Sequence, residues 1–281
     1  MTPAGQWYPA IQWYPARRSQ ARELMDDTLS DPVLLQRTLD QFSLINRLFS
    51  RMRGLVRRCI LEDIVARGTG PTGETISVLD VGAGACDIPL WLLAEARTRG
   101  IALEITCLDH DPRVVDYARR KTSREPAITV REGSALEIEG PFDYIMANHL
   151  LHHLTEPEID RFLERSFRAC RRRLLLNDLL RSYWSLAGFS LFATLFLHRS
   201  FARTDGALSI RRGFRPQELQ RLIDRSPWAG AGLGTMLPGR ICLAADKPSP
   251  EAIPRTRAVP GQRQDPSAGE PGDPPPPRAP Q

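Results

Sequence analysis

Short apolar runs alternate with amphipathic stretches from residue 77 to residue 177 of this 281-residue chain. The apolar runs show no polar alternation, which is typical of strands buried on both faces of a parallel sheet. The stretches between them have helical spacing, so the pattern predicts an α/β fold with a doubly wound parallel sheet, whose ligands bind beyond the carboxyl ends of the strands. The predicted strands are the run ending at Asp80, 103–108, 128–131, 142–147, 173–177 and 240–244, and the predicted helices are 88–99, 114–121, 156–170 and one from Pro216.

A tight glycine turn follows the first predicted strand and precedes the first predicted helix. Gly82 and Gly84 let the backbone approach a ligand closely, so the turn predicts a nucleotide-like cofactor. A dinucleotide turn has a third glycine, where this chain has Asp87, and a carboxylate there would repel phosphate. Asp80, at the end of the strand, suits a cationic cofactor without phosphate. S-Adenosylmethionine carries an ammonium and a sulfonium group and fits both observations.

The segment from Asp80 to Cys86 resembles the first motif of the class I S-adenosylmethionine-dependent methyltransferases, an acid followed by Gly-x-Gly-x-Gly. Cys86 stands at the last glycine, and a thiol side chain fits this turn if the backbone φ is below zero. The resemblance implies the Rossmann-like sheet of that family. It also implies that Asp80, Gly82, Gly84 and Cys86 surround the cofactor.

Polar residues after the second, third and fourth predicted strands extend the candidate cofactor site. Asp109 ends the second strand, where an acid hydrogen-bonds the ribose in nucleotide-binding sheets. The family resemblance gives Asp109 the same role on the adenosyl ribose. It also implies that His110, Ser134 and Ala135 lie near the adenine, and that Asn148 lies in the turn that faces the methyl group.

Three histidines, His149, His152 and His153, lie in and just before a Leu-His-His-Leu sequence that recurs after the fourth strand in this superfamily. They are candidate catalytic bases, because the pKa of histidine lies near neutrality and a phenol with a pKa near 10 becomes a better nucleophile when its proton is accepted. The alternative for each is a hydrogen-bonded structural role. No acidic side chain stands at ligand spacing from them, so we expect no metal site.

An apolar stretch without charges, residues 184–197, follows the fifth predicted strand. It is too short to span a bilayer comfortably and predicts an inserted, buried helix. The alternatives are an interfacial helix in peripheral contact with a membrane, and a lid over an apolar substrate.

The flanking segments resemble bacterial small-molecule methyltransferases associated with type III polyketide synthases. The residues that carry this resemblance are 23–27, 80–89, 177–182 and 203–214. It implies that Asp178, Asp205 and Arg211 line the substrate side of the site.

The N-terminal quarter of the chain predicts a helical cap. Ser30-Asp31-Pro32 is typical of a helix start, and apolar residues at helical spacing predict one long helix from Phe42 to Ile60. Before the cap, Gln-Trp-Tyr-Pro-Ala occurs twice, which predicts a flexible aromatic leader; its alternative is an aromatic contact with a membrane or partner. The expected organisation is a leader at 1–22, the cap at 23–73, the cofactor-binding domain at 74–247 and a disordered Pro-rich tail at 248–281.

Charge and cysteine content narrow the candidate functions. The net charge of +5 comes almost wholly from arginine, and we expect no nucleic-acid partner. The five cysteines are scattered without a disulfide or metal framework, and the N-terminus has no signal pattern, so we expect a cytoplasmic protein, with membrane association as the alternative.

These observations together predict an S-adenosylmethionine-dependent O-methyltransferase for a small apolar hydroxylated acceptor, a phenolic lipid, pyrone or polyketide. Three alternatives remain: C-methylation of a quinone ring, an inactive cofactor-binding interaction protein, and methylation of RNA.

Overall fold

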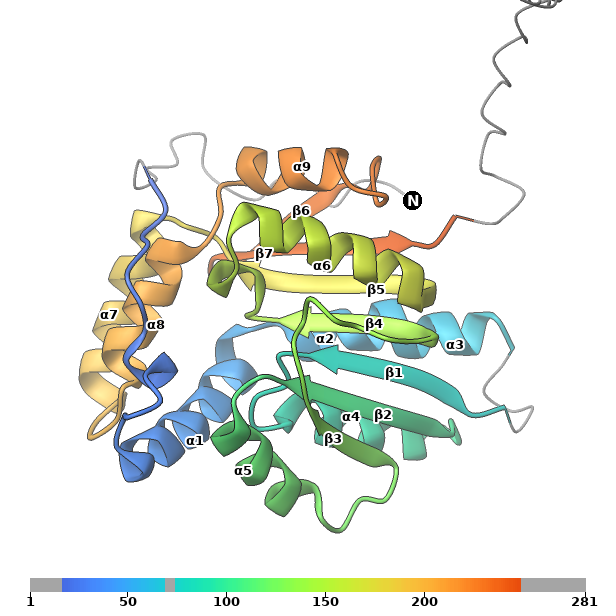
Figure 1. Ribbon diagram of the computed structural model, residues 1–281, viewed down its shortest axis with the longest axis horizontal. Helices are drawn as coiled ribbons and strands as arrows, with labels where there is room; N and C mark the ends of the chain where they lie inside the picture. Colours follow the sequence, from blue (N-terminus) through green and yellow to red (C-terminus); the bar gives the residue numbers. More distant parts are fainter. Residues whose placement is uncertain (1–16, 69–73, 249–281) are drawn as a thin grey trace, which may run out of the picture. The chain divides into compact units, whose positions relative to one another are not determined.

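The computed structural model describes residues 17–68 and 74–248, and the structure of these residues is reported below. Seven strands in this part of the chain form one sheet in the order β3-β2-β1-β4-β5-β7-β6 (Figure 1). The first five strands in chain order are parallel, whereas β7 and β6 are antiparallel to their neighbours. The strands are β1 (Ile76–Val81), β2 (Leu103–Asp109), β3 (Ile128–Glu132), β4 (Phe142–Asn148), β5 (Cys170–Leu179), β6 (Leu233–Met236) and β7 (Arg240–Asp246).

The predicted α/β fold is confirmed, but the sheet is mixed rather than wholly parallel. β6 has no counterpart among the predicted strands, and its residues are only half-buried, which leaves a weak apolar signal. A short connection joins β6 to β7, and such a connection produces antiparallel neighbours, whereas parallel strands need a long crossover.

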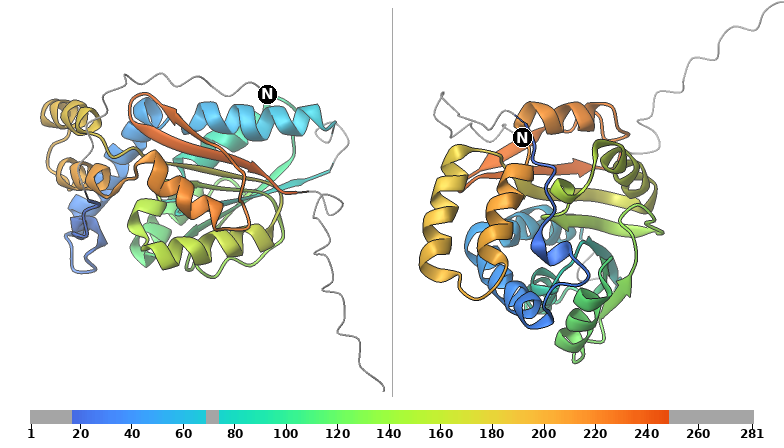
Figure 2. Two further views of the ribbon diagram at one scale, coloured as in Figure 1. Left: turned by 90° about the horizontal axis from the view of Figure 1, so that it is seen from above. Right: turned by 60° about the vertical axis from the view of Figure 1, so that its left-hand side comes forward.

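Alternate residues of the central strands face two separate apolar cores. Val78 and Met146 pack against the helices of one face, whereas Leu79 and Ile145 pack against the helices of the other. Figure 2 shows helices on both sides of the sheet, as a doubly wound fold requires. The first face carries α2 (Met52–Val56), α3 (Glu62–Ala66), α4 (Asp87–Arg97) and α5 (Pro112–Thr122), and the second carries α6 (Glu156–Ala169) and α9 (Pro216–Asp224).

The N-terminal cap begins with α1 (Pro32–Phe49), as Ser30-Asp31-Pro32 predicted. The carboxylate of Asp31 accepts hydrogen bonds from the backbone N–H groups of Val33 and Leu34, at 2.7 and 3.1 Å. These bonds satisfy two of the N–H groups that have no partner within the helix.

The single long helix predicted over residues 42–60 is wrong, because the chain breaks after α1. Ser50 donates its hydroxyl to the carbonyl of Asn46 and accepts from the N–H of Met52, which competes with the backbone ladder. Arg51 then adopts a left-handed conformation, with φ 58°. The chain resumes as α2, a π-helical turn (Arg57–Leu61) and α3.

Two helices are inserted after β5, α7 (Tyr183–Phe196) and α8 (Ala202–Arg212), and only the first was predicted. The expectation that α7 is buried is wrong: Ala193 is its only fully buried residue. One face of α7 packs on α8, where Gly206 leaves room for the ring of Phe189. Four large apolar residues of α7 are more than half exposed, and the last three of them do not line the cavity described below: Trp184, Leu191, Leu195 and Phe196. None of the helices in the described residues is both long and apolar enough to span a bilayer.

Residues 17–22, which the sequence assigned to the flexible leader, are attached to α8. Arg18 donates from Nε to the carbonyl of Arg212 at 2.8 Å, and the N–H of Ser19 donates to the carbonyl of Arg211 at 3.1 Å. This part of the expected leader therefore belongs to the fold. The aromatic repeat before residue 17 and the tail after Pro248 lie outside the described residues.

Candidate active site

A cavity of about 970 Å³ lies at the carboxyl ends of β1, β2 and β4. The glycine turn lines it, and so does the turn η3 (Leu151–His153) after β4. Further lining residues come from α1, α7, α8, residues 20–26 and residues 238–240. The cavity thus brings together the predicted cofactor residues and the predicted catalytic histidines.

The glycine turn is built by backbone conformations that favour glycine. Gly82 and Gly84 have φ of 69° and 53°. The N–H of Gly84 donates to Oδ2 of Asp109 at 2.9 Å, and a Cβ at Gly82 would lie 3.1 Å from Cδ1 of Leu150. The two predicted cofactor elements, the turn and the acid that ends β2, are therefore joined directly.

Three carboxylates lie around this turn: Asp80, Asp87 and Asp109. Burial, with the nearby charges of Asp87 and Asp109, raises the pKa of Asp80 well above its usual value. Burial also raises the pKa of Asp87, whose Oδ2 has no hydrogen-bond partner among the described residues. Buried carboxylates favour a cationic ligand. This end of the cavity therefore fits the ammonium and sulfonium groups of S-adenosylmethionine.

Cys86 departs from the expectation for this turn. Its φ is 54°, so the condition of a φ below zero is wrong, and a residue with a side chain occupies the left-handed region. Its side chain is fully buried and contacts Cys107 rather than the cavity. The structure assigns Cys86 a packing role instead of contact with the cofactor.

The other predicted cofactor residues, His110, Ser134, Ala135 and Asn148, all line the cavity. Asn148 is held by a network that joins four elements. Its Oδ1 accepts from Asn177 at 2.8 Å and from Arg240 at 3.3 Å, and its amide donates to Asn46 at 3.3 Å. This network fixes the side chain at the end of β4, next to the histidine turn.

His152 and Asp178 form a buried pair. Nδ1 of His152 lies 2.7 Å from Oδ1 of Asp178, and each residue is 2% exposed. Burial opposes ionisation of Asp178, but the charge of His152 and their hydrogen bond outweigh it and hold the pKa of this carboxyl well below its usual range. An ionised Asp178 can only accept, so Nδ1 of His152 carries a proton, and whenever the imidazole is neutral its lone pair lies on Nε2.

The other two histidines differ from His152. Burial and the charge of Arg240 lower the pKa of His149 well below its usual value, which makes it a weak proton acceptor. His153 is half-buried, and its Nδ1 lies 3.6 Å from Oδ2 of Asp26. Of the three predicted bases, His152 has the best-defined orientation.

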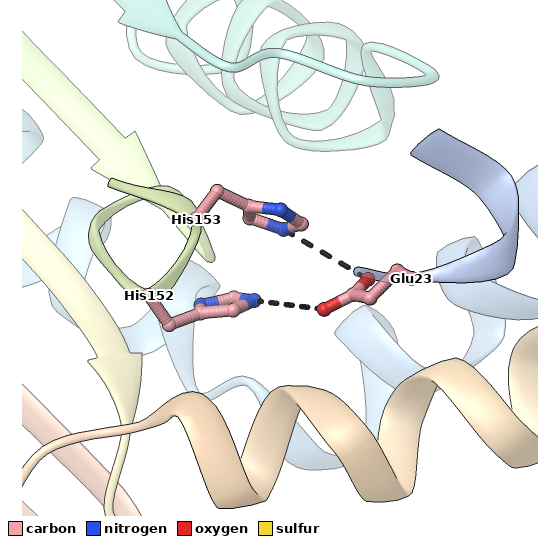
Figure 3. A group of neighbouring side chains, drawn as sticks. All are labelled: Glu23, His152 and His153. Carbon is pink, nitrogen blue, oxygen red and sulfur yellow. Dashed lines mark ion pairs between the residues drawn. The ribbon is translucent and has the colours of Figure 1, made fainter. Parts of the chain in front are cut away.

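The sequence missed the acid that joins these histidines. Figure 3 shows Glu23, from the N-terminal segment, pointing toward His152 and His153. Oε1 of Glu23 lies 3.8 Å from Nε2 of His152, and Oε2 lies 4.0 Å from Nε2 of His153. The expectation that no acidic side chain accompanies the histidines is therefore wrong. No local spacing could have identified Glu23, because it lies more than a hundred residues before them.

The predicted substrate residues Asp178, Asp205 and Arg211 do not line the cavity. Asp178 lies behind His152, and Arg211 is exposed on the outer side of α8. Asp205 is fully buried and accepts hydrogen bonds from the backbone N–H groups of Leu24 and Met25, both at 2.9 Å. Asp205 thereby holds the segment that carries Glu23. The residues of α8 that line the cavity include Ser209 and Arg212.

An apolar wall completes the cavity opposite the sheet. Phe49 of α1 and Phe192 of α7 meet edge to face, with ring centroids 4.8 Å apart. The wall suits an apolar ligand part. Its members are Phe42, Phe49, Trp184, Phe189 and Phe192.

The core of the chain, residues 78–173, matches the family model described as "Methyltransferase domain". These residues, about a third of the chain, are thus similar to a methyltransferase domain. The match supports S-adenosylmethionine, the cofactor predicted from the sequence, and the acids around the glycine turn agree with it. A non-reducing polyketide synthase of Aspergillus terreus is 34% identical to this chain over 107 residues, which are 37% of this chain and 4% of that protein.

Two solved structures of similar fold align with most of this chain. The CMeT domain of the citrinin polyketide synthase is 15% identical, with a TM-score of 0.51, and the alignment covers 68% of this chain and 51% of that one. A candidate O-methyltransferase from Nostoc punctiforme is 16% identical, with a TM-score of 0.52, over 82% of this chain and 64% of that one. This chain thus spans about half to two thirds of those two proteins, and the likeness concerns the fold alone.

Proposed function

We propose that this protein transfers the methyl group of S-adenosylmethionine to a hydroxyl of a small apolar acceptor, of the alkyl phenol, pyrone or polyketide class. The observation that carries the proposal is the cavity itself. It joins three parts that such a reaction needs: an acidic end for a cationic cofactor, the histidine turn, and an apolar wall.

At the cofactor end of the cavity, residues from different strand ends contact different parts of the cofactor. Asp109 binds the ribose hydroxyls, and Asp80 with Asp87 attracts the cationic groups. Ser134 and Ala135 lie beside the adenine. S-Adenosylmethionine supplies the methyl group, whose bond to sulfur breaks, leaving the electron pair on sulfur, as the bond to the acceptor oxygen forms.

The acceptor is activated at His152. Asp178 fixes the Nδ1 proton, which leaves the Nε2 lone pair available at the wall of the cavity. A hydroxyl near this lone pair becomes a better nucleophile, because its proton is drawn away as the new bond forms. Oxygen, methyl carbon and sulfur must also be aligned, and Asn148 and the walls of the cavity provide this positioning.

The alkyl part of the acceptor lies against the phenylalanines of α1 and α7. We propose further that the outer face of α7 contacts a membrane surface peripherally, because its large apolar side chains are exposed while its inner face lines the cavity. A lipid-borne acceptor would then enter beside α7.

C-methylation is the second candidate. A domain named CMeT, in the citrinin polyketide synthase, shares the fold of this chain, so carbon as the methylated atom is tested beside oxygen. The two reactions are separated by the product, in which the new methyl group is bonded either to oxygen or to carbon.

The first experiment titrates the full chain with S-adenosylhomocysteine by calorimetry, followed by a screen of alkyl phenols and pyrones with labelled S-adenosylmethionine. We expect stoichiometric binding that Asp109→Ala abolishes. Asp116→Asn is the matched control, because Asp116 is an exposed acid on α5 and does not line the cavity. Absence of binding by folded wild-type protein would refute the proposed function and favour an interaction protein.

A further inference from the structure

Glu23, His152 and His153 bring one carboxylate and two imidazoles to one point of the cavity wall. They come from two segments that are far apart in the sequence, as Figure 3 shows. One ligand-type atom from each lies within 4.8 Å of the others. All three residues line the cavity, so a group bound between them would be open to a ligand on one side.

Each of the three side chains is held from behind by a further polar group. Asp178 lies 2.7 Å from Nδ1 of His152, and Ser209 donates its hydroxyl to Glu23 Oε1 at 2.7 Å. Asp26 lies 3.6 Å from Nδ1 of His153. Carboxylates and hydroxyls in this position are the usual outer partners of metal-binding histidines and carboxylates, because they fix tautomer and orientation.

The charges around the cluster favour a cation. Three carboxylates, those of Glu23, Asp26 and Asp178, face the two imidazoles. The guanidinium that faces them is that of Arg212, 3.8 Å from Glu23 and 3.7 Å from Asp26. The next charged neighbours, Arg18 and Asp205, have opposite signs. The excess of negative charge is therefore the kind that a divalent ion balances.

The spacing is close to that of a zinc site. Nitrogen and oxygen ligands lie roughly 2.1 Å from zinc, which places two ligand atoms of a tetrahedral site about 3.4 Å apart. The two oxygens of Glu23 lie 3.8 Å from Nε2 of His152 and 4.0 Å from Nε2 of His153, and one ligand atom from each residue lies within 4.8 Å of the others. Rotation of these side chains by up to about an ångström brings the three ligand atoms to the separations of a tetrahedral site.

We propose that Glu23, His152 and His153 bind a divalent transition-metal ion of the zinc class, with its fourth position open to the cavity. Two histidines and one carboxylate with an open position are typical of catalytic rather than structural metal sites.

The chemical role of this ion rests on the proposed function. An acceptor hydroxyl that occupies the fourth position has its pKa lowered by the ion and releases its proton to water. With an ion bound, Nε2 of His152 is a ligand and does not accept the proton itself, so the ion replaces the direct base role of His152. The oxygen keeps its electron pair, and that pair forms the bond to the methyl carbon.

The test uses the full chain, freed of metal with a chelator and titrated with Zn²⁺ by calorimetry and with Co²⁺ by visible absorption. We expect one equivalent of each ion to bind, with the intense absorption bands of a four- or five-coordinate Co²⁺ site. Glu23→Gln, which keeps the shape of the side chain, weakens binding about 100-fold, and Asp178→Asn weakens it about 10-fold. His198→Gln, a change of an exposed histidine outside the cavity, leaves the affinity unchanged.

Three outcomes decide the proposal. No saturable binding by the wild type, or equal affinity of the wild type and a folded Glu23→Gln variant, overturns the site. Saturable binding that Glu23→Gln removes establishes the site, even if no acceptor is methylated, in which case only the proposed function fails. Methyl transfer at an unchanged rate in excess chelator overturns the role of the ion in the reaction.

Discussion

Replacing Asp178 with asparagine tests the buried pair on which the histidine end of the cavity depends. In the native protein, Oδ1 accepts from His152 and from the N–H of Leu179, at 2.7 and 2.6 Å, and Oδ2 accepts from the N–H of His152 at 3.3 Å. An asparagine has one acceptor oxygen and one NH₂ group, so at least one of these donors would face another donor. The variant also removes a charge that the imidazole faces.

The expected cost is large because both partners are buried. Removing one member of a buried, hydrogen-bonded pair costs about 3–5 kcal/mol, and asparagine retains part of the hydrogen bonding, so we expect about 3 kcal/mol at pH 7. This corresponds to about two powers of ten in the unfolding equilibrium constant. Urea unfolding followed by tryptophan fluorescence measures it. Asp160→Asn is the control, because Asp160 forms a half-exposed pair with Arg225, and we expect a loss below about 1 kcal/mol.

The same variant changes the dependence of stability on pH. The pKa of Asp178 is lower in the folded than in the unfolded state. The stability that ionised Asp178 contributes to the folded state is therefore complete above the unfolded-state pKa of about 3.9. It is lost as the pH falls from there toward the folded-state pKa. Asp178→Asn should flatten this acid-side slope. An unfolding free energy within about 0.5 kcal/mol of the wild type at pH 7, with an unchanged slope, would contradict the assignment of an ionised Asp178 paired with His152.

Three further changes probe other walls of the site. Gly82→Ala should lower the unfolding free energy by about 1–2 kcal/mol in a thermal melt and abolish S-adenosylhomocysteine binding, because φ is 69° and the new Cβ lies 3.1 Å from Leu150. Gly100→Ala is the control: its φ is also positive but nothing lies within 4 Å of the new Cβ, so stability should fall while binding stays intact. Asp205→Ala should lower stability by about 1–3 kcal/mol and speed proteolysis near residue 24, since two backbone N–H groups lose their acceptor; protection equal to the wild type would contradict its anchoring role. Leu191→Ser should reduce sedimentation with lipid vesicles while stability stays within about 0.5 kcal/mol, because Leu191 is 67% exposed and does not line the cavity; undiminished sedimentation would refute membrane contact through α7.

The sequence predicted the parts of the site that depend on local patterns. A strand, a glycine turn and a helix follow one another around Gly82, and the residues of that turn are adjacent in the sequence, so its ligand chemistry can be predicted from them. Asp109 ends the next strand, so its place beside the turn follows from the topology of a parallel sheet. His152 lies in the turn after β4 for the same reason.

The sequence did not predict features that depend on contacts between distant segments. It also did not predict those that depend on which of two adjacent residues faces the cavity. Glu23 reaches the histidines because Asp205 holds its segment, and neither residue has a local pattern that indicates this. The family resemblance indicates Arg211, whereas Arg212 lines the cavity, because one residue along a helix such as α8 turns the side chain by about 100°. The break at Arg51 occurs inside an unbroken helical apolar pattern.

Because the N-terminal segment is attached to α8, the walls of the cavity come from two different parts of the sequence. The stretch that matches a methyltransferase domain, 78–173, contains the glycine turn and Asp109, whereas Glu23, the phenylalanines of α1 and the inner face of α7 lie outside it. Under the proposed function, the residues that bind the methyl donor and many of those that face the acceptor therefore lie in different stretches of the chain. On that basis, we expect that exchanging residues 17–68 and 180–214 between relatives changes the acceptor and leaves binding of the donor intact.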